Sequence, residues 1–216
     1  MILPNRIFIG DTIGFFSPSF PASHGWDNGI NSAVSYMKEQ GFNIKLGSLT
    51  GKKDFYRSGS IQERADELNE LIFSPEVKCL MAISGGGVSN SILPYIDYES
   101  LRKNPKIIIG FSDVTAILLA IYAKTGLVTF YGPCLSCFGR KPPLHYETYK
   151  YLHDIISEPN NTPYAFPDCS NKTAVQIVEI IYHSAEHDKL SHRLTRSSVN
   201  ILVYNSALPD KCLTRL

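Results

Sequence analysis

The sequence predicts an α/β fold: a largely parallel sheet flanked by helices, in a three-layer sandwich. Apolar strand-like runs alternate with helix-like segments along residues 12–133, and most of these runs are apolar at successive positions. Strands buried on both faces have that pattern, and parallel strands need crossover connections such as helices. We expect this α/β domain to span residues 1–166 and a short atypical tail to span residues 167–216.

Turn-forming residues divide the domain into its elements. The expected strands are residues 11–19, 42–46, 77–83, 106–111 and 126–133. The expected helices are residues 26–40, 60–74, 97–104 and 113–124, with Gly41 placed to end the first of them. Ligands of such sheets bind beyond the carboxyl ends of the strands, where "SGGG" (84–87) and "GFSD" (110–113) stand.

The segment that begins at Ser60 has the clearest helix pattern in the chain. Ser60 and Glu63 have the spacing of a capping box, in which each side chain satisfies the other residue's free amide. Apolar residues then recur on one face at Ile61, Ala65, Leu68 and Ile72. The charged residues Glu63, Arg64, Glu67 and Glu70 fall elsewhere, so we expect them off the buried face.

Composition excludes several classes of protein. The 216 residues are 44% hydrophobic and 19% charged with a net charge of +1, which is typical of a globular domain. Without a basic stripe we expect no nucleic-acid partner, and without a long apolar window we expect no membrane span. The N-terminus lacks a signal-peptide pattern, and five scattered cysteines favour a reducing cytoplasm over a disulfide framework.

Ser112 stands between a predicted strand and a predicted helix, and two interpretations of it are open. Serine is favoured as an N-cap because its oxygen accepts a hydrogen bond from a helix amide. A strand–serine–helix turn also projects the hydroxyl above the sheet, where the Asp113 amide and the helix end can stabilise an oxyanion. The surrounding residues are Gly-Phe-Ser-Asp, so the G-x-S-x-G motif of lipases is absent.

Other candidate motifs are weaker. The glycines of "SGGG" let the backbone approach an anion, but neither a phosphate-loop nor a dinucleotide fingerprint is present, and a tight turn explains them equally. Cys134 and Cys137 form a lone C-x-x-C without a second ligand pair, so we expect no metal there. The histidines of the tail are His183, His187 and His192, and they fit no H-E-x-x-H arrangement.

Four segments in this order resemble the N-terminal half of the LD-carboxypeptidase family of serine peptidases, and its microcin C self-immunity branch most. They are "GDTIGFFSPSFPA", "LTGKKDFYRSGSIQERADELNELI", "CLMAISGGGVSNSILPYIDY" and "NPKIIIGFSDVTAILLAIYAKTGLVTFYGP". The resemblance covers roughly residues 5–160, and the G-[FY]-S-D-x-T segment is its most specific part.

The resemblance implies a cytoplasmic serine hydrolase without metal or other cofactor. Its substrate would be a murein peptide or a peptidyl or aminoacyl nucleotide, cleaved at an amide bond, and the family also implies a homodimer. By position, Ser112 corresponds to the nucleophile, and the backbone amides of Asp113 and Gly86 correspond to the oxyanion hole. This interpretation favours an exposed nucleophile over a cap at Ser112.

The family's glutamate and histidine come from a C-terminal domain that residues 167–216 do not match. We therefore expect a truncated or frameshifted member, or an N-terminal domain with an unrelated ending, that has little activity. A binding module that retains its ligand without cleaving it, and a non-functional fragment, are the alternatives.

Overall fold

A parallel sheet forms the centre of the computed structural model, which describes residues 1–139, 144–157, 178–179, 202–203 and 214–215. Its parallel strands have the order β2-β1-β3-β4-β5. They are β1 (Thr12–Phe16), β2 (Asn43–Leu46), β3 (Val77–Ala82), β4 (Ile107–Gly110) and β5 (Phe130–Tyr131). Three two-residue antiparallel strands continue the sheet beyond β5: β6 (Val178–Glu179), β7 (Leu202–Val203) and β8 (Thr214–Arg215).

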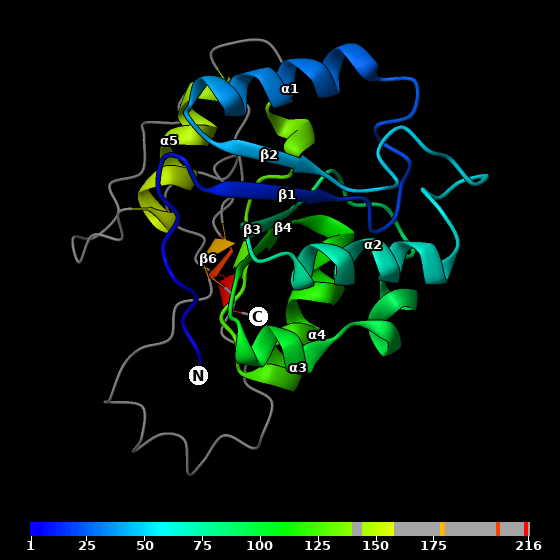
Figure 1. The fold of residues 1–216 in the computed structure, drawn as a ribbon, viewed down its shortest axis with the longest axis vertical. Helices are drawn as coiled ribbons and strands as arrows, with labels where there is room; N and C mark the ends of the chain where they lie inside the picture. Colours follow the sequence, from blue (N-terminus) through cyan, green and yellow to red (C-terminus); the bar gives the residue numbers. More distant parts are fainter. Residues whose placement is uncertain (140–143, 158–177, 180–201, 204–213, 216) are drawn as a thin grey trace.

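Helices cover both faces of this sheet (Figure 1). The α-helices are α1 (Asp27–Glu39), α2 (Ile61–Phe73), α3 (Tyr98–Lys103), α4 (Thr115–Thr125) and α5 (Leu144–Ile156). Short 3-10 helices are η1 (Ser89–Tyr95), η2 (Ser112–Val114) and η3 (Leu135–Cys137). Figure 1 shows α1 and α5 on one side of the sheet and α2, α3 and α4 on the other. The predicted three-layer α/β fold is confirmed.

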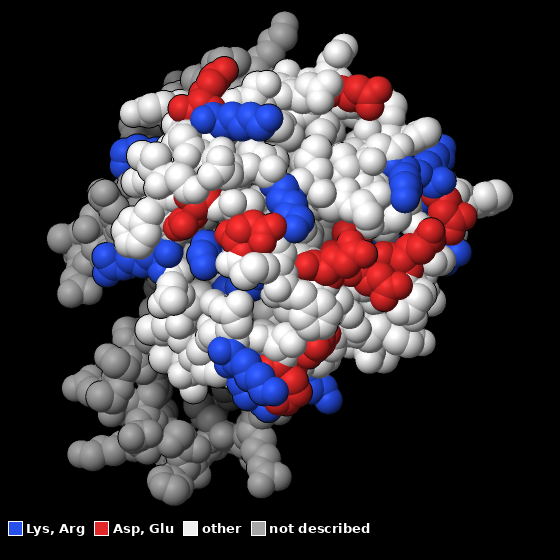
Figure 2. Space-filling view, viewed as in Figure 1, with Lys and Arg blue, Asp and Glu red and all other residues white. Residues whose placement is uncertain are grey.

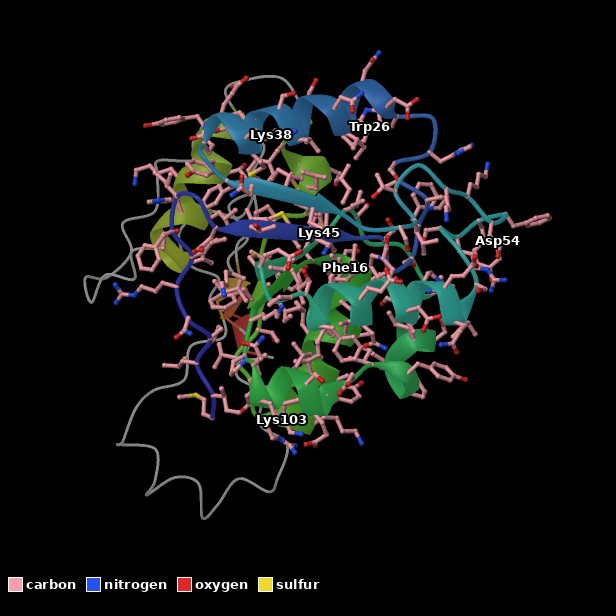
Figure 3. The ribbon with its side chains drawn as sticks, in the orientation of Figure 1. Phe16, Trp26, Lys38, Lys45, Asp54 and Lys103 are labelled. Carbon is pink, nitrogen blue, oxygen red and sulfur yellow. The ribbon has the colours of Figure 1, made fainter. Side chains whose placement is uncertain are left out.

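The alternation of side chains along β1 divides the core in two. Ile13 and Phe15 pack in the apolar cluster that includes the buried residues of α1 and α5. Phe16 points to the opposite face and packs with residues of α2, α3 and α4 (Figure 3). Successive residues of a strand face opposite sides of a sheet, so a strand that is apolar throughout contributes to both clusters.

Helix α2 confirms the predicted cap and corrects the predicted exposure of its charges. The Ser60 hydroxyl accepts from the Glu63 amide at 3.2 Å, and the Glu63 carboxylate accepts from the Ser60 amide at 2.8 Å. Arg64 and Glu67 were expected off the buried face, yet each side chain is only 1% exposed. The expectation was wrong because backbone groups of neighbouring loops, which the helical period does not reveal, surround both charges.

Other sequence predictions differ from the structure mainly at element ends. Residue Gly41, with φ 91°, follows α1 as predicted, because glycine adopts the left-handed conformation without strain. Helix α4 begins at Thr115 rather than at residue 113, because η2 forms the preceding turn. The boundary near residue 166 and most of the tail after it lie outside the described residues.

The described surface has mixed charge. Figure 2 shows acidic and basic side chains interspersed on one face, which has no continuous basic stripe among the described residues. No helix of the described residues has the length and apolar character that a membrane span requires.

Candidate active site

Ser112 lies in a strained turn directly after the buried strand β4. Its φ is 61°, whereas Phe111 before it is extended with φ −145° and ψ 178°. A serine in the left-handed region of φ/ψ space is energetically unfavourable, so the contacts around it must stabilise this conformation. Such backbone outliers cluster at functional sites. A sharp strand-to-helix turn of this kind lifts the side chain above the end of the sheet. The Ser112 hydroxyl makes no hydrogen bond with any described residue.

Contacts on three sides fix this turn. The Thr115 hydroxyl donates to the Ser112 carbonyl at 2.6 Å, and the Ser112 amide donates to the Tyr131 hydroxyl at 3.4 Å. Gly110 lets the chain turn closely, since a Cβ there would stand 2.7 Å from Cγ1 of Val114. The backbone of Ser112 is therefore bonded while its hydroxyl stays available.

The structure does not support the cap interpretation of Ser112. Helix α4 has Val114 at its N-cap position, and no side chain caps either η2 or α4. The Asp113 carboxylate instead accepts hydrogen bonds from the amides of Val88 and Ser89, at 3.1 and 3.0 Å. These two residues follow strand β3. The Asp113 carboxylate therefore makes a tertiary contact rather than capping the helix.

The glycine loop, residues 84–88, packs against this serine. A Cβ on Gly85 would lie 3.3 Å from the Asp113 nitrogen, the Phe111 oxygen and the Ser112 Cβ. These distances are tighter than most contacts of a Cβ atom, so a side chain at this position would require the turn to shift by a few tenths of an ångström. Strands β3 and β4 are neighbours in the sheet, so the loops at their carboxyl ends meet.

Gly86, the next residue, is held against the loop that follows β1. Its φ is 159°, and a Cβ there would stand 2.2 Å from the Ser19 hydroxyl oxygen and 2.7 Å from the Phe20 nitrogen. The same hydroxyl oxygen accepts from the amides of Gly87 and Val88, both at 3.0 Å. Ser19 is fully buried, so these bonds are shielded from water.

The structure thus brings the predicted residues Ser112, Asp113 and Gly86 to one place, although their catalytic roles stay predictions. It also adds Ser19 and Arg64, which sequence reasoning missed. A serine after a proline in a loop has no distinguishing pattern, and Arg64 was expected to lie in solvent. Only the tertiary arrangement shows what these two side chains bind.

A general base for Ser112 is not among its described contacts. His24 is exposed, and its Nδ1 lies 3.1 Å from the Gly51 carbonyl oxygen. His145 belongs to helix α5, and His183, His187 and His192 lie outside the described residues.

The predicted lack of a metal at Cys134 and Cys137 stays a prediction. Cys134 is fully buried, and burial raises the pKa of its thiol, which disfavours the thiolate that binds metals. Within the described ranges, no group of three or more histidine, cysteine, aspartate or glutamate residues has the arrangement of a metal site.

The parallel α/β sheet carries a strained serine after one strand and a glycine loop after its neighbour, an arrangement that also occurs in serine hydrolases. Comparison with known proteins agrees. A model of the LD-carboxypeptidase N-terminal domain matches residues 13–132, which are more than half of the chain. The protein belongs to the LD-carboxypeptidase family.

Individual relatives support this assignment. A Vibrio cholerae protein named provisionally as a carboxypeptidase is 57% identical over 169 residues, which cover 77% of this chain and 51% of that protein. The microcin C7 self-immunity protein of Escherichia coli is 49% identical over 166 residues, which cover 76% and 48%. This chain therefore spans about half the length of these relatives.

Solved structures give the same result. The unliganded microcin C7 self-immunity protein superposes with a TM-score of 0.75 at 48% identity, covering 78% of this chain and 51% of that one. Other structures of that protein hold aspartyl sulfamoyl adenosine or glutamyl sulfamoyl guanosine. A muramoyltetrapeptide carboxypeptidase of Oxalobacter formigenes has the same fold, with a TM-score of 0.61 at 24% identity over 68% of this chain and 48% of that one.

Proposed function

We propose that this chain carries the nucleophile half of a serine amidase site, with Ser112 as the nucleophile. The observation that carries the proposal is the Ser112 turn, which has φ 61°, an unbonded hydroxyl among the described residues and a glycine loop packed against it. A serine that acts as an N-cap would have its hydroxyl bonded to a helix amide. A nucleophilic serine needs a hydroxyl that is free to meet a base and a substrate, and the strained turn leaves the Ser112 hydroxyl in that state among the described residues.

The proposed reaction is attack of the Ser112 oxygen on the carbonyl carbon of an amide. A base takes the hydroxyl proton as the C–O bond forms, and the carbonyl oxygen becomes an oxyanion that accepts hydrogen bonds from the Gly86 and Asp113 amides. The intermediate collapses, the C–N bond breaks and the amine leaves with a proton. Water then releases the acyl group from Ser112. One oxyanion donor contributes about 3–4 kcal/mol in comparable sites.

The proposed substrates follow from the relatives. The family includes murein peptide carboxypeptidases, and the microcin C7 self-immunity protein binds aminoacyl sulfamoyl nucleotides. We place the small peptidyl or aminoacyl conjugate at the end of the sheet because the loops after β1, β3 and β4 meet there, beyond the carboxyl ends of the strands. Action in the cytoplasm and a homodimer are parts of the proposal that rest on the family resemblance alone.

The test is hydrolysis of a murein tetrapeptide and of an aminoacyl sulfamoyl adenosine by the purified chain and its Ser112→Ala variant. We expect slow release of product that the variant abolishes. Ser32→Ala, which alters an exposed serine of α1, is the matched control and should hydrolyse at the parent rate. Equal rates for the parent and Ser112→Ala would refute the proposal.

A binding module is the second candidate, because no base contacts the Ser112 hydroxyl among the described residues. Calorimetry with aspartyl sulfamoyl adenosine separates the two functions. Tight binding without Ser112-dependent turnover would favour the binding module over the amidase.

A further inference from the structure

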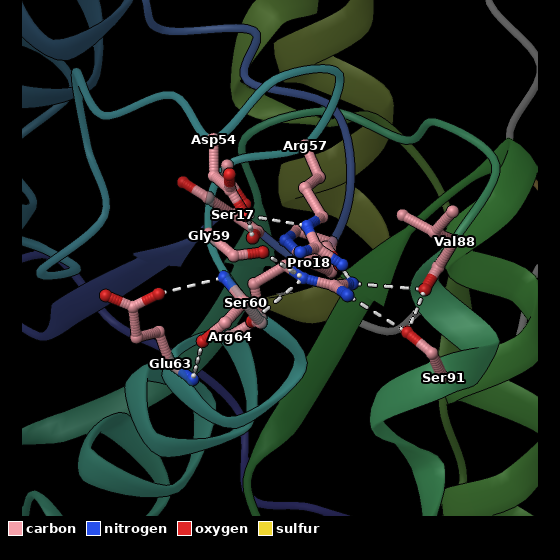
Figure 4. Close-up of polar contacts among 11 residues, drawn as sticks. Ser17, Pro18, Asp54, Arg57, Gly59, Ser60, Glu63, Arg64, Val88 and Ser91 are labelled. Carbon is pink, nitrogen blue, oxygen red and sulfur yellow. Dashed lines mark hydrogen bonds and ion pairs between the residues drawn. The ribbon is translucent and has the colours of Figure 1, made fainter.

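Arg64 is a buried cation whose partners are backbone and hydroxyl oxygens. The residue is 1% exposed, and no carboxylate of a described residue lies within ion-pair distance of its guanidinium. It donates to the carbonyls of Pro18 at 2.7 Å, Gly59 at 3.0 Å, Ser60 at 3.3 Å and Val88 at 3.1 Å, and to the Ser91 hydroxyl at 3.0 Å (Figure 4). A buried charge without a counter-ion is costly unless hydrogen bonds compensate it.

These partners belong to three separate segments at the carboxyl end of the sheet. Pro18 lies in the loop after β1, and Gly59 and Ser60 precede α2. Val88 ends the glycine loop after β3, and Ser91 lies in η1, which follows it directly. The guanidinium is planar, with five donors in a fixed fork, so it sets the relative positions of what it binds. The Arg64 side chain thus joins the glycine loop to the loop after β1 and to the segment before α2.

The peptide between Val88 and Ser89 is bound at both ends by opposite charges. Its carbonyl accepts from Arg64 Nη1 at 3.1 Å, and its amide, that of Ser89, donates to Asp113 Oδ2 at 3.0 Å. The negative end of the peptide dipole faces the cation and the positive end faces the anion. Both are charge-assisted hydrogen bonds, which are stronger than bonds between neutral groups.

The Asp113 end of this arrangement belongs to the Ser112 turn itself. Its carboxylate also accepts from the Val88 amide at 3.1 Å, and its backbone carbonyl accepts from the Ser89 hydroxyl at 2.5 Å. The glycine loop is thereby tied to the turn that carries the serine. Any movement of the loop away from Ser112 would break bonds to a charge at either end of the peptide.

We infer that Arg64 and Asp113 are positioning residues that clamp the Val88–Ser89 peptide and so hold the glycine loop against Ser112. The clamp rests on the proposed function only in its purpose, which is to keep the Gly86 amide directed at the developing oxyanion. Whether Arg64 and Asp113 restrain the glycine loop can be measured without any catalytic activity.

Amide hydrogen exchange in the purified chain, followed residue by residue by NMR, tests the clamp. In Arg64→Met and in Asp113→Asn we expect the Val88 and Ser89 amides to exchange at least about tenfold faster, relative to core amides of β3. A tenfold change in the exchange rate corresponds to the loss of one charge-assisted hydrogen bond. The Ser89 amide resonance should also shift in Asp113→Asn, because its acceptor loses its charge.

Lys106→Met is the matched control. Lys106 is also a buried cation, 2% exposed, that donates to the backbone carbonyls of Leu71 and Ser74 near the start of β4, away from the glycine loop. It should lower global stability and leave exchange in the loop, relative to the core, at the parent value. Arg64→Lys replaces Arg64→Met if the latter does not fold. It keeps the charge but loses the planar guanidinium, so exchange of the Val88 and Ser89 amides should be faster than in the parent but slower than expected for full loss of the side chain.

Two results would overturn the clamp. One is loop exchange in Asp113→Asn and in the Arg64 variants that matches the parent after normalisation to the core. The other is equal acceleration in Lys106→Met, which would make the effect a general loss of stability. If the parent hydrolyses substrate, the kcat of Asp113→Asn should fall about tenfold with KM little changed. Absence of Ser112-dependent hydrolysis would refute the proposed function, whereas the exchange rates still decide the clamp.

Discussion

At the scale of single residues, the site depends on backbone conformations that residues other than glycine rarely adopt. Ser112 and Phe55 have positive φ without being glycines in the described chain. The strand before Ser112 and the family resemblance predicted an exposed serine, because both depend on local sequence. The φ of 61° and the contact with Gly85 could not be predicted, since they arise only when β3 and β4 lie side by side.

Gly86→Ala tests whether the glycine loop needs its close approach. A Cβ would collide with the Ser19 hydroxyl and the Phe20 nitrogen, and the latter is backbone that cannot rotate away. We expect unfolding by urea to show a loss of about 1–3 kcal/mol, as for overpacked sites, and Ser112-dependent hydrolysis to fall with it.

Gly87→Ala is the neighbouring control, because a Cβ on Gly87 would have no atom within 4 Å. Its stability should stay within about 1 kcal/mol of the parent, the usual cost of glycine and alanine exchanges. Equal losses for the two variants would contradict the steric explanation.

At the scale of elements, α2 shows where sequence reasoning succeeds and where it stops. The capping box depends on residues three apart and was predicted correctly from Ser60 and Glu63. The amphipathic pattern placed Arg64 and Glu67 in solvent, because it assigns charges to the face away from the core. Both instead bind backbone groups of loops that are distant in sequence, and no helical period encodes those partners.

Glu67 should make folding stability depend on pH. Its carboxylate accepts from the amides of Ser17 at 2.6 Å and Leu49 at 2.8 Å, joining the loops after β1 and β2. Burial raises the pKa of Glu67 to about 7, although the two amides oppose the shift. An unfolded glutamate has a pKa of about 4.3, so between these two pKa values the folded protein keeps a proton that the unfolded chain has lost.

This stabilising contribution is therefore complete below pH 4.3 or so and is lost as the pH rises toward 7. Urea unfolding of the parent and of Glu67→Gln between pH 4.5 and 8 measures it. The free energy of the parent should fall relative to the variant by on the order of 2–4 kcal/mol across that window. Asp66→Asn, which neutralises an exposed acid of the same helix, should keep the pH dependence of the parent. A parallel pH dependence in the parent and Glu67→Gln would refute this role.

At the scale of the whole molecule, strand order decides which loops meet. The sequence predicted a parallel sheet but not the order β2-β1-β3-β4-β5, because apolar runs carry no record of which strand pairs with which. In this order the chain crosses from one side of β1 to the other between β2 and β3. The direction reverses between β1 and β3, and open α/β sheets bind ligands beyond the carboxyl ends of the strands at such a point. Ser19 and the glycine loop lie at those ends, and the glycine loop also contacts the Ser112 turn.

At the same scale, the proposed nucleophile Ser112 needs a general base, and the supply of that base limits the rate expected of the whole chain. General base catalysis contributes about 10²–10⁴-fold, and members of a triad act as a unit, so the loss of one removes most of the benefit. Among the described residues no histidine, aspartate or glutamate bonds to the Ser112 hydroxyl. We expect this 216-residue chain to cleave aspartyl sulfamoyl adenosine at least about a hundredfold more slowly than the Escherichia coli microcin C7 self-immunity protein.

Initial rates of the two proteins under identical conditions check this expectation, with Ser112→Ala as the background. The murein tetrapeptide carboxypeptidase of Pseudomonas aeruginosa provides the same comparison on its peptide substrate. A rate within about tenfold of either relative, abolished by Ser112→Ala, would contradict the prediction. Such a rate requires a base from outside the described residues, and His183, His187 and His192 would be the side chains to replace first.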